Sequence, residues 1–384
     1  MSNISSTANM KDQWQPWEIL ITSIPMSLLI AEIVLGNLLV LVAVLSQRPL
    51  RTPSNIIILS LAVADLAVGV FILPLNIIDM IIGWRLGKVM CRIWLTSDVT
   101  LCSTSILHIS AIAVDRFRSI NEGVAYAQSR TIRMSLIVCG SLWLIALWIA
   151  SAPVLGWNDW DRSKLNSSSD YMECYLTRDL GYIIHSASGA FFIPAAIMVG
   201  LYFRIFLLIR NKLRERAGII CVSKSTNDKT NIDRQDTSSG NMVNDALLNA
   251  IKDSSRTPEK SIDENTICDV NNEGKRKKKH SEQIETILKN KLRFSLTKER
   301  KAAKTLGIII GAFIVCWTPF TLCYLTSGII GNDVPFWLFQ LVTWLGYINS
   351  GLNPIIYTIY NPEFRKAFAV LLNGVLCRVT THLK

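Results

Sequence analysis

The 384-residue sequence contains little charge and very little histidine. Charged residues make up 18% of the chain, hydrophobic residues make up 50%, and the mean hydropathy is +0.32. This hydropathy is too high for an ordinary soluble protein of this length. The four histidines are scattered and have no spacing typical of metal ligands or of a nucleophile with its base; they lie at positions 108, 185, 280 and 382. We therefore expect no metal centre, no catalytic site and no enzymatic activity.

Three further absences narrow the class of protein. No cleavable signal peptide is visible, because residues 1–19 are polar and lack an apolar core. No internal repeat is evident, which leaves a transporter built from duplicated halves as a remote alternative. The net charge of +11 is not accompanied by a module that combines basic and aromatic residues, so we expect no nucleic-acid partner.

The apolar residues are concentrated in seven stretches that meet or approach the roughly 20 residues needed to cross a bilayer. They are residues 20–45, 55–80, 91–117, 134–155, 182–209, 303–328 and 336–358, and the last is the most polar. This pattern predicts an all-α membrane protein, a bundle of seven transmembrane helices embedded among membrane lipids. The predicted regions are an N-terminus (1–19), spans one to five (20–209), a long and largely disordered third cytoplasmic loop (210–302), spans six and seven (303–358) and a tail (359–384).

Lysine and arginine are concentrated in alternate loops. Arg48 and Arg51 follow the first span, and the segment 210–304 is strongly basic, whereas the loop 156–181 carries five acidic and three basic residues. Because positively charged loops stay in the cytoplasm, we expect an extracellular N-terminus, a cytoplasmic C-terminus and a location in the plasma membrane. The glycosylation sequons at Asn3 and Asn166 fall on the expected outer side.

Two cysteines lie on the expected oxidising side of the membrane. Cys91 opens the third span and Cys174 lies in the outer loop between spans four and five, so these two are the natural disulfide pair. Cys377 follows an amphipathic stretch just inside the membrane and is a candidate for palmitoylation.

A single acidic residue interrupts the outer part of the third span. Burying the Asp98 carboxylate in a membrane is costly and usually marks a functional site. Helical spacing places Cys102 and Ser105 on the same face of the span. The outer halves of spans five, six and seven contain no Lys, Arg or His apart from His185. A ligand cation is therefore the expected partner of Asp98.

Aromatic residues in spans six and seven favour a cationic ligand. Trp317, Phe320 and Tyr324 are three and four residues apart and share a helix face, and Trp344 and Tyr347 are three apart. An ammonium group bound by a carboxylate and surrounded by rings gains cation–π attraction as well as ion pairing. The alternative is that these rings only pack between helices or form an interfacial belt.

A second set of polar residues lies at mid-depth in spans one, two, three and seven. Its members are Asn37, Asp65, Ser105, Asn349, Ser350 and Asn353. They are suited to bind a hydrated cation such as sodium, with Asp65 as the charged ligand. A structural hydrogen-bond network between helices is the competing interpretation.

The cytoplasmic end of the third span carries Asp115 and Arg116. Arg116 is 18 residues from Asp98, or five helical turns, so the two side chains share a face and lie roughly 27 Å apart. Glu299, before span six, is placed to pair with Arg116 and close the inner end of the bundle. Prolines 194, 319 and 354 permit kinks in spans five, six and seven.

Short motifs in the same order resemble those of the rhodopsin-like (class A) G protein-coupled receptors. They are "GN" at Asn37, "LAVAD" at Asp65, "DRF" at 115–117, Trp143, "CWTP" at 316–319 and "NPIIY" at 353–357. The resemblance implies a seven-helix bundle, a short surface helix at 362–372 and a heterotrimeric G protein as partner, with arrestin and receptor kinases as further partners. It also implies an activation switch made of Ile106, Pro194 and Phe313 below Trp317, together with Asn353, Pro354 and Tyr357.

Within this family the chain is similar to receptors for biogenic amines. Asp98 stands at the amine-binding position, "WLGYINS" at 344–350 is the aminergic form of span seven, and Tyr347 occupies the place of an opsin's Schiff-base lysine. The resemblance adds Val99 and Thr321 to the ligand site. "GWNDW" at 156–160 and "SASGAFFIP" at 186–194 favour invertebrate tyramine and octopamine receptors. Inhibitory serotonin receptors are the close rival, and a peptide receptor would give no reason for Asp98.

Several residues depart from the family pattern, and they affect the expected ligand and the expected contact with the G protein. Ser186 is followed by Ala187 and Ala190, where catecholamine receptors have hydroxyl residues, so one hydroxyl suits a monophenol such as tyramine or octopamine. Thr321 replaces a second Phe and makes the aromatic cage smaller. Phe117 replaces the usual Tyr, and the next loop lacks its customary proline. Coupling to Gi, with lowered cAMP, is expected from the resemblance alone.

Overall fold

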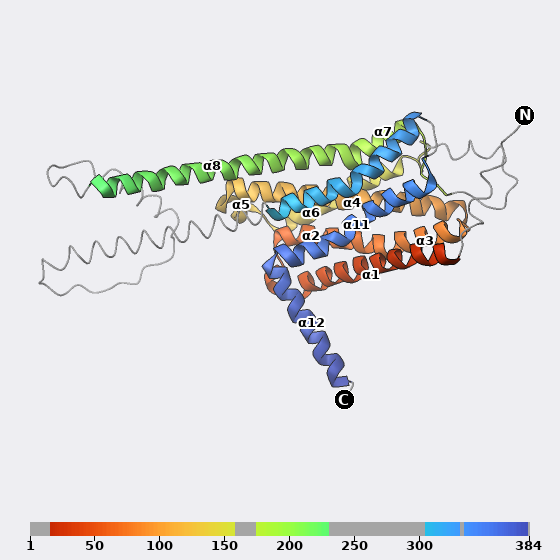
Figure 1. Ribbon diagram of the computed structural model, residues 1–384, viewed down its shortest axis with the longest axis horizontal. Helices are drawn as coiled ribbons and strands as arrows, with labels where there is room; N and C mark the ends of the chain where they lie inside the picture. Colours follow the sequence, from red (N-terminus) through yellow and green to blue (C-terminus); the bar gives the residue numbers. More distant parts are fainter. Residues whose placement is uncertain (1–15, 158–173, 230–303, 331–333, 383–384) are drawn as a thin grey trace, which may run out of the picture. The chain divides into compact units, whose positions relative to one another are not determined.

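The computed structural model describes residues 16–157, 174–229, 304–330 and 334–382, and every regular element in these ranges is helical (Figure 1). Asn3, Asn166 and Glu299 lie outside the described residues. The chain forms two compact units, one of residues 1–207 and 299–384 and the other of residues 208–298. The first unit contains the helix bundle and the polar sites.

Long apolar helices dominate the first unit. In chain order the elements are α1 (Pro16–Ser46), η1 (Arg48–Leu50), α2 (Pro53–Ala67), η2 (Val68–Ile72), α3 (Leu73–Ile82), α4 (Gly87–Glu122), α5 (Val124–Ser129), α6 (Ile132–Ser151), α7 (Leu180–Ala187), η4 (Ser188–Phe192), α8 (Ile193–Lys229), the helix Lys304–Ile330, α11 (Phe336–Tyr360) and α12 (Pro362–His382). Six of the described helical segments are long and apolar enough to cross a membrane. The seventh, α11, is the polar one, and the predicted all-α seven-helix fold is confirmed.

Capping residues set where several helices begin. The Thr52 side chain accepts a hydrogen bond from the Asn55 amide with Pro53 in the first turn of α2, and Thr131 accepts one from the Met134 amide at the start of α6. Asp179 does the same for the Tyr182 amide and starts α7. These side chains satisfy amides that lack a partner in the first helical turn. Helices α2, α6 and α7 therefore begin at fixed positions.

Two spans contain a π-helical turn that the sequence analysis did not predict. η2 interrupts the second span just before Pro74, and η4 interrupts the fifth span just before Pro194. Proline cannot donate a backbone hydrogen bond, and a widened turn accommodates the disrupted ladder. The irregularity expected at Pro194 thus takes the form of a π turn that ends at Phe192, two residues before it.

Glycines bring α1 close to its neighbours. A methyl group added at Gly36 would lie 2.9 Å from Cγ of Pro354 in α11, and one added at Gly69 would lie 2.9 Å from Cγ2 of Ile33. The opposite face of α1 exposes Leu28 and Leu35, each 66% accessible. A helix with large apolar side chains facing outward and small residues facing its neighbours is typical of a membrane bundle.

The last helix is longer than predicted. The expected surface helix covered residues 362–372, whereas α12 extends from Pro362 to His382 and leaves the bundle after α11 (Figure 1). Phe364 is fully buried and its ring lies 5.6 Å from that of Tyr357, so the start of α12 is anchored to α11. Cys377 lies in α12, but its side chain is outside the described part. The six-residue helix α5 was not predicted either.

Candidate functional site

The Asp98 carboxylate in α4 is held by two side-chain hydrogen bonds. The hydroxyl of Tyr347 in α11 donates to Oδ2 at 3.0 Å, and the thiol of Cys102, one turn along α4, donates to Oδ1 at 3.4 Å. Within the part of the chain that the structure describes, Asp98 forms no ion pair. His185 instead packs against Trp148, with ring centroids 5.0 Å apart. A partly buried carboxylate bound only by neutral donors attracts a cation.

Three aromatic rings follow one face of the helix Lys304–Ile330. Trp317 and Phe320 meet edge to face at 5.8 Å, and Phe320 stacks on Tyr324 at 5.8 Å. The Tyr324 hydroxyl donates to the Thr177 carbonyl at 2.9 Å, so this row is tied to the segment before α7. Phe339 of α11 packs against Phe320 at 5.6 Å and extends the row. The face shared by the three predicted rings is thus present in the structure.

Trp344 is buried and is fixed by a hydrogen bond of its own. Its Nε1 donates to the Asn76 side-chain carbonyl at 2.9 Å, and it belongs to a buried cluster that includes Trp84 and Trp94. Its ring is perpendicular to that of Tyr347, with centroids 5.9 Å apart. Trp344 therefore supports Tyr347, which in turn reaches Asp98.

The two hydroxyl residues expected in the site bond to their own helices. Ser186 Oγ donates to the Ile183 carbonyl at 3.2 Å, and Thr321 Oγ1 donates to the Trp317 carbonyl at 2.9 Å. Both side chains are buried. Each oxygen retains lone pairs and is able to accept a further hydrogen bond.

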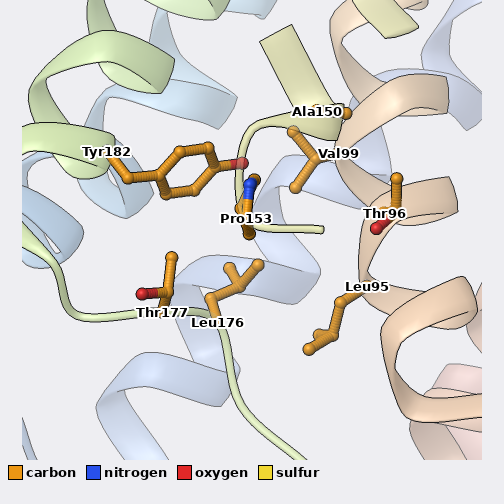
Figure 2. A pocket seen from close by; sticks show the side chains of 8 residues that line it. All are labelled: Leu95, Thr96, Val99, Ala150, Pro153, Leu176, Thr177 and Tyr182. Carbon is orange, nitrogen blue, oxygen red and sulfur yellow. The ribbon is translucent and has the colours of Figure 1, made fainter. Parts of the chain in front are cut away.

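A small cavity lies beside Val99, one residue after Asp98 (Figure 2). Its lining side chains come from α4, the end of α6, the segment before α7 and α7 itself: Leu95, Thr96, Val99, Ala150, Pro153, Leu176, Thr177 and Tyr182. Its volume of about 10 Å³ is room for about one water molecule. Sequence reasoning found Val99 but missed Tyr182 and Thr177. The position of Tyr182 one turn before Ser186, on the same helix face, was an available signal.

The Cys91–Cys174 disulfide that the sequence predicted is formed. The Cα atoms lie 5.8 Å apart, and the bond joins the first turns of α4 to the segment that precedes α7. That segment contributes Leu176 to the cavity and the Thr177 carbonyl to Tyr324. The disulfide therefore holds the segment against the end of the bundle that contains Asp98.

The deeper polar residues meet around Asp65. Asn353 of α11 donates to Asp65 Oδ2 at 2.8 Å, and Asn37 of α1 donates to the Ser350 carbonyl at 3.1 Å. Asp65 Oδ1 and Ser105 Oγ are buried and have no hydrogen-bond partner among the described residues. Ser350 and Asn349 are also buried. These contacts join α1, α2 and α11, and they leave two oxygen atoms with bonding capacity.

The residues expected to form the activation switch are buried below the rings. Phe313 is fully buried and its ring lies 5.6 Å from that of Phe191 in η4, and Ile106 and Pro194 are also buried. Near the opposite end of α4, Arg116 Nε lies 4.0 Å from Asp115 Oδ2. The Tyr357 hydroxyl is buried without a partner in the described chain, and Pro354 lies inside α11. The predicted Arg116–Glu299 pair stays a prediction.

Comparisons with known proteins agree with this arrangement. The profile of the "7 transmembrane receptor (rhodopsin family)" matches residues 36–357. The octopamine receptor of Bombyx mori is 34% identical and the alignment covers 93% of this chain and 88% of the relative. Tyramine receptor 1 of Locusta migratoria is 34% identical, with coverage of 93% and 90%. The 5-hydroxytryptamine receptor 1B of Vulpes vulpes is 34% identical, with coverage of 93% and 87%.

Proposed function

The chain belongs to the rhodopsin family of seven-transmembrane receptors, in its biogenic amine group, and on that premise we propose that it binds protonated tyramine or octopamine. One observation carries the choice of site. The Asp98 carboxylate of α4 bonds to the Tyr347 hydroxyl of α11 and to the Cys102 thiol, and these are its only hydrogen-bond partners among the described residues. An ammonium group would supply the positive charge that these donors lack.

In the proposed complex the ring of the amine lies between the ammonium site and Ser186. The hydroxyl of Ser186 forms a hydrogen bond with a single phenolic hydroxyl of the amine. Ala187 and Ala190 have no hydroxyl that could bind a second phenolic group. Trp317, Phe320, Tyr324 and Tyr347 enclose the ligand, with Val99 and Thr321 at its side. The edge-to-face and stacked rings of the sixth span support this enclosure.

Signalling follows from a shift between two populations of the bundle. Agonist binds more tightly to the state in which the inner end of the sixth span is displaced, so that state becomes more populated. Arg116 then leaves Glu299 and contacts a heterotrimeric G protein. We propose that this G protein is Gi and that cAMP is lowered, with arrestin and receptor kinases acting later.

The end of the bundle that contains Asp98 and the disulfide faces the outside of the plasma membrane, where the disulfide is stable.

We propose a sodium ion as an allosteric ligand of the deeper polar group. Asp65 is fully buried, and its Oδ1 and the Ser105 hydroxyl lack partners in the described chain, which fits a cation that binds oxygen atoms. Asn349 and Asn353 complete the proposed set. No step of the signalling scheme depends on this ion.

Serotonin is the second candidate ligand. The similarity to the 5-hydroxytryptamine receptor 1B of Vulpes vulpes reaches the same 34% identity as that to the insect receptors. Serotonin would use the same carboxylate and the same single hydroxyl. Cells that express the chain separate the candidates when tyramine, octopamine, serotonin, dopamine and histamine are compared by cAMP and calcium signals.

Asp98→Asn tests the proposed amine site. We expect tyramine affinity to fall at least about 100-fold, because removing the charge from one member of a desolvated ion pair costs about 2–5 kcal/mol. The measurement is radioligand competition on intact cells with equal receptor surface density. Asp179→Asn is the matched control, since asparagine also caps a helix and affinity should not change. Unchanged tyramine affinity in Asp98→Asn would reject the site.

A further inference from the structure

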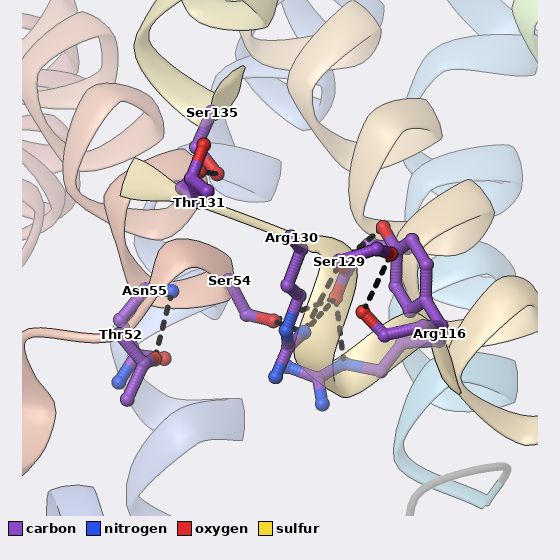
Figure 3. Close-up of polar contacts among 10 residues, drawn as sticks. Thr52, Ser54, Asn55, Arg116, Ser129, Arg130, Thr131 and Ser135 are labelled. Carbon is purple, nitrogen blue, oxygen red and sulfur yellow. Dashed lines mark hydrogen bonds and ion pairs between the residues drawn. The ribbon is translucent and has the colours of Figure 1, made fainter. Parts of the chain in front are cut away.

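Asp115 is surrounded by three side chains from outside its own helix, and Figure 3 shows two of them, Ser54 and Arg130. Ser54 Oγ of α2 donates to Oδ2 at 2.7 Å, and the Tyr126 hydroxyl of α5 donates to Oδ1 at 3.1 Å. Arg130, between α5 and α6, places Nη1 3.2 Å from Oδ1 and 3.5 Å from Oδ2. Arg130 Nη1 also donates to Ser54 Oγ. We call these four residues the Asp115 cluster.

The neighbours of Asp115 occupy most of the acceptor positions of its carboxylate, so few remain for Arg116. A carboxylate has about four lone-pair positions, and Ser54, Tyr126 and the two contacts from Arg130 account for four. Arg116 Nε lies 4.0 Å from Oδ2, beyond the distance of a hydrogen bond. The arginine next to Asp115 in the sequence is thus held more loosely than the arginine 15 residues away.

Burial favours the pair that Arg130 makes. The side chains of Asp115 and Arg130 are 8% and 24% exposed, and that of Arg116 is 32% exposed. Ion pairs shielded from solvent are screened less by salt than exposed ones. Arg118 does not compete for Asp115, because it pairs with Glu122 at 3.0 Å and lies over the Tyr126 ring at 4.6 Å.

We propose that Arg130 is a positioning residue for signalling: it neutralises Asp115 and so keeps the Arg116 guanidinium available to the G protein. The inference rests on the proposed function, since it takes Arg116 to be the group that the G protein contacts. Without Arg130, the Asp115 carboxylate turns to Arg116 as its nearest remaining cation. The ion pair between these two neighbours then holds Arg116 away from its partner.

Arg130→Gln tests this role in the full-length receptor. We expect ligand-free nucleotide exchange on co-expressed G protein, per receptor at the surface, to fall about fivefold, the equivalent of an ion pair worth about 1 kcal/mol. Arg130→Lys should recover part of the loss, because lysine keeps the charge but not the planar fork. Arg133→Gln, an exposed arginine in the first turn of α6, is the matched control and should change nothing.

A second arm measures the contact without any signalling. Melting temperatures of the purified receptor are compared for Arg130→Gln, Asp115→Asn and the double variant. If the two residues interact, the double variant is less destabilised than the sum of the single variants. In the signalling assay, Arg130→Gln should have no effect in the Asp115→Asn background, since no carboxylate remains to bind Arg116.

Two results of the signalling assay would overturn the proposal: higher ligand-free exchange in Arg130→Gln, or an equal loss with and without the Asp115 carboxylate. Additive melting temperatures would also overturn it. The native receptor could activate no G protein while its melting temperatures still show an interaction between Asp115 and Arg130. That result would contradict the proposed function, whereas the contact between the two residues would stand.

Discussion

Tyr347 connects Asp98, the centre of the proposed ligand site, to the rest of the bundle. Its hydroxyl donates to Asp98, and its ring rests on Trp344, which is fixed by Asn76. The hydrogen bond gives the carboxylate a polar partner in a region with little water, where an unpaired charge is costly. An ammonium ligand would provide a stronger partner for the same carboxylate. The contribution of the Tyr347 hydroxyl to the stability of the receptor should therefore depend on whether ligand is bound.

Tyr347→Phe should destabilise the ligand-free receptor by about 1.5–3 kcal/mol, because it removes a hydrogen bond to a charged group and keeps the ring. At saturating tyramine the loss should be smaller, since the ammonium supplies the missing partner. The measurement is the melting temperature of purified receptor with and without tyramine. Tyr360→Phe, near the end of α11, is the control. An equal loss in both conditions would show that ligand and hydroxyl do not share Asp98.

At the scale of residues, chemical type and helical spacing predicted the shared face of the three rings and singled out Asp98 as a candidate site. A charged residue in an apolar span and aromatic residues at intervals of three and four are features of a single helix, so they can be recognised from the sequence alone. Tyr182 shared a helix face with Ser186 but had no unusual residue type for its span, and Arg130 gave no signal at all. Their roles depend on contacts between segments that are distant in the sequence, such as that of Arg130 with Ser54, 76 residues away. Spacing within one helix carries no information about those contacts.

At the scale of elements, the approach of α1 to α11 depends on Gly36. A methyl group there would meet the rigid ring of Pro354, which cannot move aside as a flexible side chain would. The same stretch of α11 contains Asn353, which bonds to Asp65. Separation of these two helices would thus disturb the deeper polar group as well as the packing.

Gly36→Ala should lower the free energy of unfolding by about 1–3 kcal/mol, the usual cost of inserting a methyl group into a well-packed contact. Gly140→Ala is the matched control, because no atom lies within 4 Å of a methyl group added at Gly140 in α6. Thermal unfolding of both purified variants provides the comparison. Equal melting temperatures for the two would contradict tight packing of α1 on α11.

Hydropathy predicted the spans well because long apolar runs have few alternatives to a membrane helix. It could not predict η2 and η4, since a π turn adds one residue without changing the apolar pattern. Nor did it predict α5 or the full length of α12, which lie outside the apolar runs. Their helicity depends on local propensity and on anchors such as Phe364.

At the scale of the whole molecule, the disulfide joins parts of the chain that are 83 residues apart. Replacing both Cys91 and Cys174 with serine should cost about 2–5 kcal/mol and reduce the amount of receptor at the cell surface. Flow cytometry with a label on the N-terminus measures this loss. Cys323→Ser, which removes a free thiol, is the control and should leave surface density unchanged. Normal surface density without the disulfide would show that other contacts hold the segment before α7.

The cavity beside Val99 has consequences for how fast a ligand is captured. Its volume of about 10 Å³ is far smaller than any aromatic amine. If the proposed amine occupies this cavity, Tyr182, Leu176 and their neighbours must separate to admit it. The association rate is then governed by the frequency of that separation and falls below the diffusion limit. A slow entry of this kind also prolongs the stay of a ligand once the side chains have closed behind it.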